Sequence, residues 1–357
     1  MRILHVISSA ASGGAEIYVK DLSKAMVKEG NDVFIVFLDR AIEAGRDAGF
    51  EAAFLDELDQ HGIHYGFLGQ ECRKNPIKGA LRLRRLFNDF KPDVVHSHLY
   101  YASVFAWFLP KCKRVYTHHN IKLGAKPALY RFLDVKTDAY IGICQACQDM
   151  LENVTRRQVE HIDNGVDVSR IILKDRYTSS NNVKLLFVGR LSQQKNLSLL
   201  ITAMSKLPSG AAVELMIAGE GPLKTSLETL ISELKLEDKV TFLGNCSNVK
   251  ELLNNADVFV MSSAWEGLPI AQIEATLTGL PVLVTNVGGC AEIVNRVENG
   301  LVAEVNVNDY TEKLTQIVSD ASFRERCFEN AIANGFQYTV NNAVAKHLQL
   351  YSRLVEQ

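Results

Sequence analysis

The sequence predicts a doubly wound α/β protein in which parallel sheets are covered by helices on both faces. Short apolar runs such as RILHVIS, DVFIVFL, KLLFVG and PVLVT recur along most of the chain. Continuous rather than alternating hydrophobicity is typical of strands buried on both faces of a parallel sheet. Because amphipathic segments separate these runs, the chain follows a repeated strand–helix–strand pattern.

The pattern begins at the N-terminus and restarts near the middle of the chain. IYVKDLSKAMVKEG follows the first strand, with Leu22 and Met26 on one face and Gly30 placed to end a helix. The polar stretch DRYTSSNN, 175–182, precedes a fresh strand at Val183. A length of 357 residues favours two domains. We expect domains at 1–175 and 176–339, followed by a terminal helix at about 340–357.

Composition and cysteine usage favour a cytoplasmic location. The chain is 47% apolar and 22% charged, which is ordinary for a globular protein. No apolar run approaches the roughly 18 residues that span a bilayer, and the N-terminal stretch does not resemble a signal peptide. The seven cysteines are scattered, which suits a reducing compartment.

Charge is unevenly distributed along the chain. The block 73–136 holds 14 Lys and Arg against 3 Asp and Glu, whereas the whole chain has a net charge of −2. Such a block predicts an anionic partner, but no nucleic-acid-binding motif accompanies it. An anionic membrane surface at the inner face of the cytoplasmic membrane is one expectation, and a phosphorylated acceptor is another. KGALRLRRLFNDF, 78–90, is expected to form a membrane-surface helix with Leu81, Leu86 and Phe90 on its apolar side. Scattering of the charges over several faces is the alternative.

Loops after the strands carry the candidate binding residues, because ligands of open α/β sheets bind beyond the carboxyl ends of the strands. SSAASGGAE follows the first strand, and its Gly13-Gly14 pair lets backbone approach an anion at a helix N-terminus. VGRLSQQKN follows the first strand of the second half, where Arg190 and Lys195 make a diphosphate cradle. AGEGPLK is a further Gly-rich loop at a strand end.

Two carboxylates flank the turn in WEGLPIAQIEATLTGLP, 265–281. Pro269 suits the first turn of a helix that Gly279 and Pro281 close. Glu266 precedes this helix and Glu274 lies within it. A carboxylate accepts hydrogen bonds from two vicinal hydroxyls at once, so this spacing favours binding of ribose and a sugar.

Taken in this order, the motifs GGAE, GRLSQQKN, AGEGP, the E-x7-E pair and NVGGCAEIV resemble the retaining GT-B glycosyltransferases of family 4. The resemblance extends from Met1 to about Tyr351. It implies a GT-B fold of two Rossmann-like domains facing a cleft, with the C-terminal helix packing back on the first domain. It also implies that the first domain binds the acceptor and the second binds a nucleotide-sugar donor.

The resemblance implies a role for each matching residue. Arg190 and Lys195 would hold the diphosphate, Glu274 the ribose and Glu266 the donor sugar, and His119 would act beside the sugar with His118 as the reserve. The catalytic residues are expected to be His119, Glu266, Arg190 and Lys195. The donor-binding residues are expected to be Gly14, Arg190, Lys195, Gly219, Glu266, Gly267, Leu268, Pro269, Ile270 and Glu274. The acceptor-binding residues are expected to be His98 and His118.

The reaction implied is retaining transfer from a nucleotide sugar, with UDP favoured, to a saccharide or lipid-linked saccharide of a bacterial surface polysaccharide such as O-antigen, lipopolysaccharide or capsule. The sequence holds no Asp-x-Asp pair, so we expect no metal and no cofactor, with Arg190 and Lys195 in place of the metal. A GT-B nucleotide-sugar epimerase and a non-enzymatic two-domain binding protein remain alternatives. Only an enzyme that binds a donor sugar uses both carboxylates and both cations.

Overall fold

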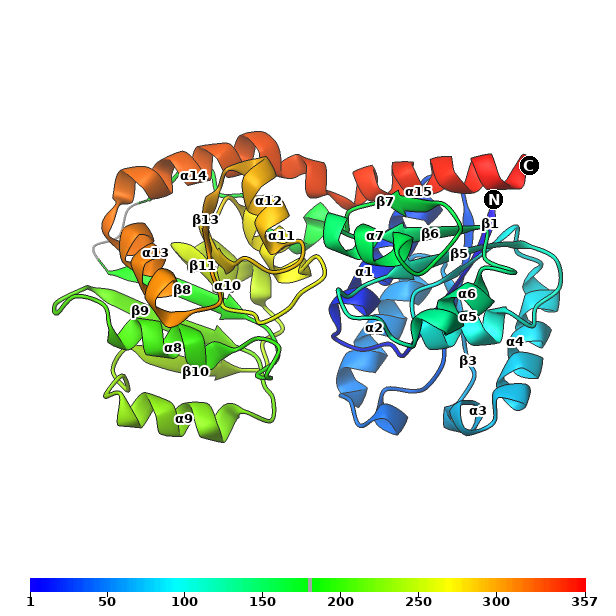
Figure 1. Cartoon of the computed structure of the whole chain (residues 1–357), viewed down its shortest axis with the longest axis horizontal. Helices are drawn as coiled ribbons and strands as arrows, with labels where there is room; N and C mark the ends of the chain where they lie inside the picture. Colours follow the sequence, from blue (N-terminus) through cyan, green and yellow to red (C-terminus); the bar gives the residue numbers. More distant parts are fainter. Residues whose placement is uncertain (179–181) are drawn as a thin grey trace. The chain divides into compact units, whose positions relative to one another are not determined.

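The computed structural model describes residues 1–178 and 182–357, without the side chains of residues 73 and 74. The chain forms two compact units (Figure 1). The first comprises Met1–Gly165 together with Val340–Gln357, and the second comprises Val166–Thr339. Each unit is built around one parallel sheet, so the doubly wound α/β class that the sequence predicts is confirmed twice.

The sheet of the first unit has seven parallel strands in the order β3-β2-β1-β4-β5-β6-β7. They are β1 (Arg2–Ile7), β2 (Asp32–Phe37), β3 (His64–Phe67), β4 (Val94–Ser97), β5 (Lys113–His118), β6 (Ala139–Gly142) and β7 (Val159–His161). Leu4 of β1 lies opposite Phe34 of β2 and Val95 of β4. Strand order reverses between β1 and β4, and such a reversal is where open sheets bind ligands.

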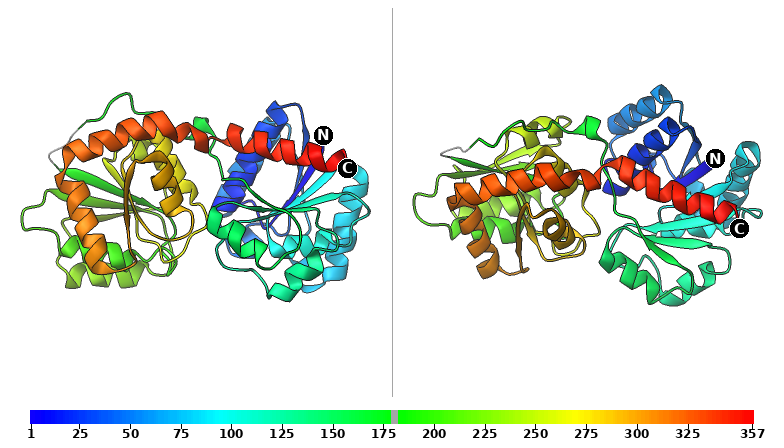
Figure 2. Two further views of the ribbon diagram at one scale, coloured as in Figure 1. Left: turned by 45° about the horizontal axis from the view of Figure 1, so that its top comes forward. Right: turned by 90° about the horizontal axis from the view of Figure 1, so that it is seen from above.

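Helices cover both faces of this sheet. They are α1 (Gly14–Lys28), η1 (Ile42–Ala44), α2 (Ala48–Gln60), α3 (Gln70–Lys74), α4 (Pro76–Phe90), α5 (Tyr100–Ala106), α6 (Pro127–Leu133), α7 (Gln145–Glu152) and α15 (Val340–Val355). Leu83 and Phe87 of α4 pack with Phe105 of α5 against Leu4 and Val95 on one face. Helix α15 packs against α1 (Figure 2), and its Tyr351 bonds to His96 of β4 from the other face.

The sheet of the second unit has six parallel strands in the order β10-β9-β8-β11-β12-β13. They are β8 (Val183–Val188), β9 (Val213–Ala218), β10 (Val240–Gly244), β11 (Val258–Met261), β12 (Val282–Thr285) and β13 (Gly300–Ala303). The order reverses between β8 and β11, where Leu185 lies opposite Val258. The loops after these two strands contain the charged residues expected to bind the donor.

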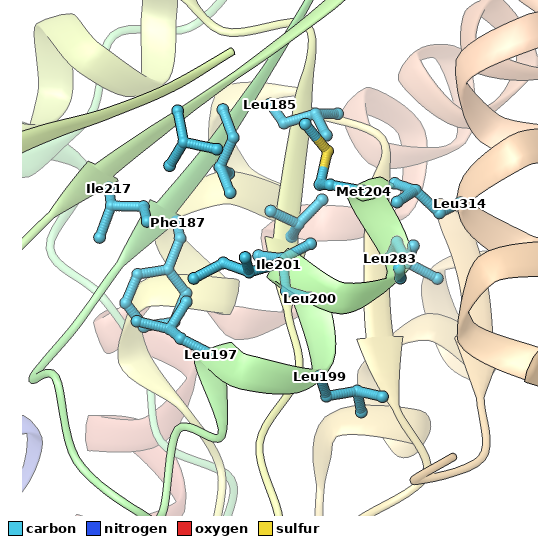
Figure 3. Close-up of a cluster of buried hydrophobic side chains, with 14 of the residues drawn as sticks. Leu185, Phe187, Leu197, Leu199, Leu200, Ile201, Met204, Ile217, Leu283 and Leu314 are labelled. Atoms are coloured by element: carbon cyan, nitrogen blue, oxygen red, sulfur yellow. The ribbon is translucent and has the colours of Figure 1, made fainter. Parts of the chain in front are cut away.

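Helices again lie on both faces. They are η2 (Val168–Arg170), α8 (Leu197–Ser205), α9 (Lys224–Glu233), α10 (Val249–Asn255), α11 (Ile270–Thr278), α12 (Cys290–Val297), α13 (Val307–Ser319), α14 (Ala321–Asn334) and η3 (Gly335–Tyr338). Figure 3 shows Leu197, Leu200 and Met204 of α8 packed with Phe187 of β8 and Leu314 of α13 in one apolar cluster. A second cluster joins α10, α11 and α12 to the opposite face. Together the two clusters hold the strand ends, and so the loops, in place.

The chain leaves the first unit at Gly165, ten residues before the boundary expected at 175. Residues 166–174 belong to the second unit because they are hydrogen-bonded to it. Val166 N donates to the carbonyl of Tyr338 over 3.0 Å, and Lys174 N donates to the carbonyl of Thr278 over 3.2 Å. Of the polar stretch taken as the boundary, residues 179–181 lie outside the described residues.

Candidate active site

The buried carboxylate of Glu266 is the centre of the candidate donor site in the second unit. Glu266 is 5% exposed and follows β11. Its Oε1 accepts hydrogen bonds from Lys195 Nζ over 2.6 Å and from Ser263 Oγ over 2.8 Å. Its Oε2 accepts from Gln194 Nε2 over 3.2 Å. A buried carboxylate is stable only with such partners, so these contacts fix its orientation.

The structure brings Lys195 and Glu266 together but leaves Arg190 apart from them. The aliphatic chain of Lys195 lies beside Gly189, and a Cβ on that glycine would lie only 3.3 Å from Lys195 Cε. Ser262 Oγ donates to the carbonyls of Lys195 and Asn196 and holds the loop against β11. Arg190 is exposed, and its guanidinium has no hydrogen-bond or ion-pair partner within 1–178 and 182–357. Arg190 is therefore the free cation of this loop.

Glu274 is held by an arginine that the sequence analysis did not identify. Glu274 is 6% exposed in α11, and its Oε1 accepts a hydrogen bond from Nη2 of Arg170. Arg170 ends η2, a single turn whose N-cap, Asp167, accepts the amide of Ser169 at its Oδ1 over 3.0 Å. The two partners lie 104 residues apart, and no motif connects them. Only the fold reveals this contact.

Glycines allow the strand-end loops of the second unit to touch. Gly219 has φ +143°, and a Cβ there would lie 1.9 Å from the carbonyl oxygen of Gly189. Gly288 has φ +50°, and a Cβ there would lie 1.9 Å from the carbonyl oxygen of Glu266. Gly289 N also donates to the carbonyl of Gly267 over 2.7 Å. Side chains at Gly219 and Gly288 would force these loops apart.

The N-terminus of α11 lies in the same group of loops. Pro269 occupies the N-cap position, and no side chain caps the helix. Leu268 is 4% exposed and Ile270 is 8% exposed, so the turn is anchored by apolar burial. The first amides of an uncapped helix can donate to an anion, and the helix dipole favours negative charge there. The backbone donors at this end of α11 are the amides from Ile270 onward, because Pro269 has no N–H.

In the first unit, Gly14 is the first residue of α1 and directly follows the β1 loop. No side chain caps α1, whose N-cap is Gly13. The Glu16 carboxylate turns back over Gly13, where a Cβ would lie 2.1 Å from Glu16 Oε2. Glu16 Oε1 accepts hydrogen bonds from Ser8 Oγ and from Arg46 Nη1, the latter over 3.2 Å. The GGAE motif thus supplies a carboxylate at this turn as well as the glycine expected from it.

The candidate histidines separate into two groups. His98 Nδ1 and His119 Nε2 lie 3.1 Å apart within hydrogen-bonding reach, and His5 Nδ1 lies 2.9 Å from His98 Nε2. His118 instead contacts the Tyr116 hydroxyl over 2.6 Å and the Lys122 carbonyl over 3.1 Å. The fold therefore joins His98 to His119, whereas both nitrogens of His118 are occupied elsewhere.

Burial keeps these histidines neutral. Desolvation, with neighbouring histidines, lowers the pKa of His5 and of His119 to about 3. Desolvation also lowers the pKa of His118 to about 4 and holds the pKa of His98 well below its ordinary value. At neutral pH each ring therefore carries one proton, and can both donate and accept one hydrogen bond.

The basic block 73–136 is divided between structural and exposed residues. Arg114 donates to the carbonyls of Ala106, Leu109 and Pro110, so its charge stabilises a loop. Helix α4 buries Leu83, Phe87 and Phe90, whereas Leu81 is 63% exposed beside Ile77 at 75%. Phe90, expected with Leu81 and Leu86 on the apolar side of a membrane-surface helix, is instead buried, because the packed stripe of α4 runs through positions 83, 87 and 90. Within the described residues, no helix is both long and apolar enough to cross a bilayer.

Family models match both halves of the chain. A model described as Glycosyltransferase Family 4 matches residues 12–170, and one described as Glycosyl transferases group 1 matches residues 170–334. A UDP-Gal:alpha-D-GlcNAc-diphosphoundecaprenol alpha-1,3-galactosyltransferase of Escherichia coli is 24% identical, over 84% of this chain and 86% of its own. The lipopolysaccharide core biosynthesis glycosyltransferase LpsE of Rhizobium meliloti is 27% identical, over 92% of each chain.

Solved structures share the whole fold. The Anabaena protein HepE in complex with UDP superposes with a TM-score of 0.81 at 21% identity, covering 99% of this chain and 100% of its own. WaaG, a glycosyltransferase involved in lipopolysaccharide biosynthesis, superposes with a TM-score of 0.74 at 15% identity, covering 98% and 99%. The GT-B fold is therefore confirmed.

Proposed function

This chain belongs to the group 1, family 4 glycosyltransferases, and we propose that it transfers a sugar, with retention, from a UDP-sugar to a saccharide or lipid-linked saccharide acceptor. The product is a bacterial surface polysaccharide such as O-antigen, lipopolysaccharide or capsule. The observation that carries the proposal is the buried Lys195–Glu266 pair at the point where the second sheet reverses.

The donor assignment is supported by the chemistry of the loops. A nucleoside diphosphate needs cations and backbone donors for its phosphates and acceptors for its ribose hydroxyls. The cations are Arg190 and Lys195, and the backbone donors lie at the N-terminus of α11. Glu274 supplies the acceptor for the ribose hydroxyls. The E. coli relative is named for UDP-Gal, and the structure of HepE holds UDP. UDP is therefore the nucleotide that we propose.

In this proposal the departing phosphate gains negative charge while the sugar gains oxocarbenium character. Arg190, Lys195 and the free amides of α11 stabilise the phosphate charge in a preorganised site. Glu266, already oriented by Ser263 and Gln194, accepts hydrogen bonds from donor-sugar hydroxyls. His119 contacts the donor sugar, and Gly14 donates its amide to the leaving phosphate. The acceptor lies on the side of His98 and His118, whose ring nitrogens are bonded within the first unit. Arg190 and Lys195 act in place of a metal ion.

The acceptor assignment is supported by the names of the relatives. The E. coli enzyme is named for a diphosphoundecaprenol-linked sugar. A Campylobacter jejuni enzyme, 25% identical over 99% of each chain, is also named for an undecaprenol-linked glycan. A lipid-linked acceptor places the reaction at an anionic membrane surface. We therefore assign this protein to the cytoplasm, in peripheral contact with the inner membrane face.

Helix α4 is the proposed membrane contact. Ile77 and Leu81 are exposed one turn apart, and Arg84 and Arg85 are exposed one turn further on. This combination suits an interface of apolar chains and anionic head groups. Co-sedimentation with anionic vesicles at low salt should fall when Ile77 and Leu81 are both replaced by Ser. It should not fall for Val305→Ser, at another exposed apolar residue, which lies in the other unit. Absence of binding by the unsubstituted protein would remove this part of the proposal.

The direct test of the transfer reaction is incubation with UDP-sugars and a polyprenyl-diphosphate-linked saccharide, followed by mass spectrometry and NMR of the product. A lipid-linked product with an α-linkage from an α-linked donor supports retaining transfer. Release of an epimerised UDP-sugar without transfer would favour the epimerase alternative. Binding of nucleotide with neither product would favour the binding-protein alternative. Full activity in the presence of EDTA is expected.

A further inference from the structure

Two buried histidines and one partly buried histidine of the first unit form a continuous chain that the proposed reaction leaves unexplained. His5 lies in β1, His98 directly follows β4, and His119 directly follows β5. His5 and His98 are completely or almost completely buried, at 0% and 1% exposed. Nδ1 of His5 lies 2.9 Å from Nε2 of His98, and Nδ1 of His98 lies 3.1 Å from Nε2 of His119. Both nitrogens of the central ring are therefore used in the chain.

The two ends of the chain are open. Nε2 of His5 and Nδ1 of His119 are buried atoms with no hydrogen-bond partner among the residues that the structure describes. Buried ring nitrogens of this kind are rare and require an explanation. The chain starts inside the sheet at β1 and ends at the ring expected beside the donor sugar.

A metal site is the first alternative, because ligand atoms of His5, His96 and His98 lie within 4.8 Å of one another. The contacts of His96 disfavour it. His96 Nδ1 bonds to the Tyr351 hydroxyl over 2.5 Å, and its Nε2 bonds to the Thr117 hydroxyl over 2.6 Å. A metal ion would have to break one of these buried bonds as well as one of the two bonds of His98.

Proton counting shows that the chain has only two neutral arrangements. Three neutral imidazoles carry three N–H protons, and the two hydrogen bonds use two of them. If His119 donates to His98 and His98 to His5, the third proton lies on Nε2 of His5. If His5 donates to His98 and His98 to His119, the third proton lies on Nδ1 of His119. The low pKa values of His5 and His119, about 3 in each case, exclude a charged ring at neutral pH.

We propose that His5, His98 and His119 form a neutral proton relay, in which His5 and His98 are positioning residues that set the tautomer of His119. Because both hydrogen bonds of the chain point in the same direction, the nitrogen of His5 that carries the proton decides whether Nδ1 of His119 donates or accepts a hydrogen bond. Conversion of one arrangement into the other moves one proton across each of the two hydrogen bonds, releases the proton on Nε2 of His5 and adds one at Nδ1 of His119, so every ring is neutral in both arrangements.

The relay gives His119 a property that suits a sugar hydroxyl, which both donates and accepts hydrogen bonds. Nδ1 of His119 can present an N–H or a lone pair without taking up a charge. The corresponding change at the other end of the chain is the loss or gain of the proton on Nε2 of His5. This use of the relay rests on the proposed function, which places His119 beside the donor sugar. The relay itself rests only on the geometry of the three rings.

The test is ¹⁵N NMR of histidine side chains in the full-length protein, because ring nitrogen shifts distinguish the two neutral tautomers. His5→Leu removes the far end of the chain without touching His119. The relay predicts that the ratio of His119 tautomers changes roughly two- to tenfold, as expected for one net hydrogen bond. In a His98→Phe background the same His5→Leu substitution should leave the ratio unchanged. An unchanged ratio in the single variant would overturn the relay, and so would one equivalent of bound metal that is lost with His5.

Two further variants keep the test decisive if His98→Phe fails to fold. The Asn amide reaches the position of a histidine Nδ1 and the Gln amide that of Nε2, so His98→Asn keeps a partner for His119 and His98→Gln keeps one for His5. The relay predicts that His5→Leu no longer affects His119 in either background. His64→Gln is the control, since His64 is exposed on β3 and outside the chain of rings.

Kinetics separate this inference from the proposed function. His98→Gln, which leaves His119 without its partner, should lower kcat for transfer more than His98→Asn does, and His64→Gln should not lower it. If His5→Leu changes the tautomer ratio of His119 but His98→Gln and His98→Asn lower kcat equally, the relay is supported and the position of His119 at the sugar is contradicted. If His5→Leu leaves the tautomer ratio of His119 unchanged, the relay is overturned whatever the kcat values are.

Discussion

Arg170 and Glu274 form an ion pair inside the second unit, although 104 residues separate them in the chain. The Glu274 side chain is 7% exposed and that of Arg170 is 26% exposed. The guanidinium holds one carboxylate oxygen of the residue expected to bind ribose. A carboxylate that is already oriented loses less entropy on binding than one that must be ordered by its ligand.

Replacement of Arg170 should therefore weaken nucleotide binding without removing a nucleotide contact. We expect Arg170→Ala to raise the Kd for UDP roughly tenfold, which is about 1.4 kcal/mol. Arg170→Lys should lie between this variant and the wild type, because a lysine keeps the charge but not the planar fork. Isothermal titration calorimetry measures both. Arg176→Ala, at an exposed arginine nearby in sequence, is the control, and an equal loss in that variant would contradict the assignment.

The Glu266 carboxylate should be needed for transfer and not for nucleotide binding. Glu266→Gln keeps the shape of the side chain and removes the charge that pairs with Lys195. The freed lysine should hold the diphosphate as tightly as before or more tightly. Transfer should fall roughly a hundredfold, as for loss of one transition-state contact. Glu312→Gln, at an exposed position in α13, should change neither quantity. A parallel loss of UDP affinity and transfer in Glu266→Gln would show that Glu266 does not act at the sugar.

The buried histidines should make the protein sensitive to acid. The pKa of His5 and of His119 falls to about 3 on folding, and that of His347 to about 4, through desolvation. The unfolded chain, with histidine pKa near 6.5, binds more protons than the folded chain below that pH. Stability from these groups is therefore complete above pH 6.5 and is lost as the pH falls. Each group contributes a slope of up to about 1.4 kcal/mol per pH unit.

Urea unfolding at pH 7.5, 6.5 and 5.5 measures this slope. We expect the free energy of unfolding to fall steeply between pH 6.5 and 5.5, and a His347→Phe variant that folds to show a smaller slope. His64→Gln should leave the slope unchanged, because His64 is exposed. A free energy that is independent of pH over this range would mean that these rings are charged or accessible in the folded protein.

Gly288 should not tolerate a side chain, because it lies where its loop contacts the loop of Glu266. Gly288→Ala puts a Cβ 1.9 Å from the Glu266 carbonyl and also requires φ +50°. We expect a loss of about 3 kcal/mol in unfolding free energy, together with reduced transfer. Gly210→Ala is the matched control, because Gly210 also has positive φ but no atom within 4 Å of the Cβ position. It should cost about 1 kcal/mol and leave transfer intact. Equal effects of the two variants would mean that the loop contact is unimportant.

Local sequence patterns determined what could be predicted about this protein. The buried strands, their parallel order and the positions of Arg190, Lys195 and Glu266 after strands followed from hydrophobic runs and from motifs. The ion pair of Arg170 and the chain from His5 to His119 depend on contacts between distant segments, which no local pattern encodes. The position of Phe90 on α4 was predicted wrongly for a different reason. Leucine and phenylalanine occur on several sides of this helix, so the sequence did not single out Leu83 and Phe87 as the buried residues.

The donor site is tested most directly by a thermal-shift panel of UDP, GDP, ADP, CMP and NAD on the wild-type protein and on Arg190→Ala. A ligand at about 100 times its Kd adds roughly 2.7 kcal/mol of stability, which raises Tm by several degrees. We predict that UDP alone raises Tm in the wild type, and that the rise is largely lost in Arg190→Ala and kept in Arg176→Ala. No rise with any nucleotide, or an equal rise with UDP in Arg190→Ala, would contradict a donor site built on Arg190 and Lys195.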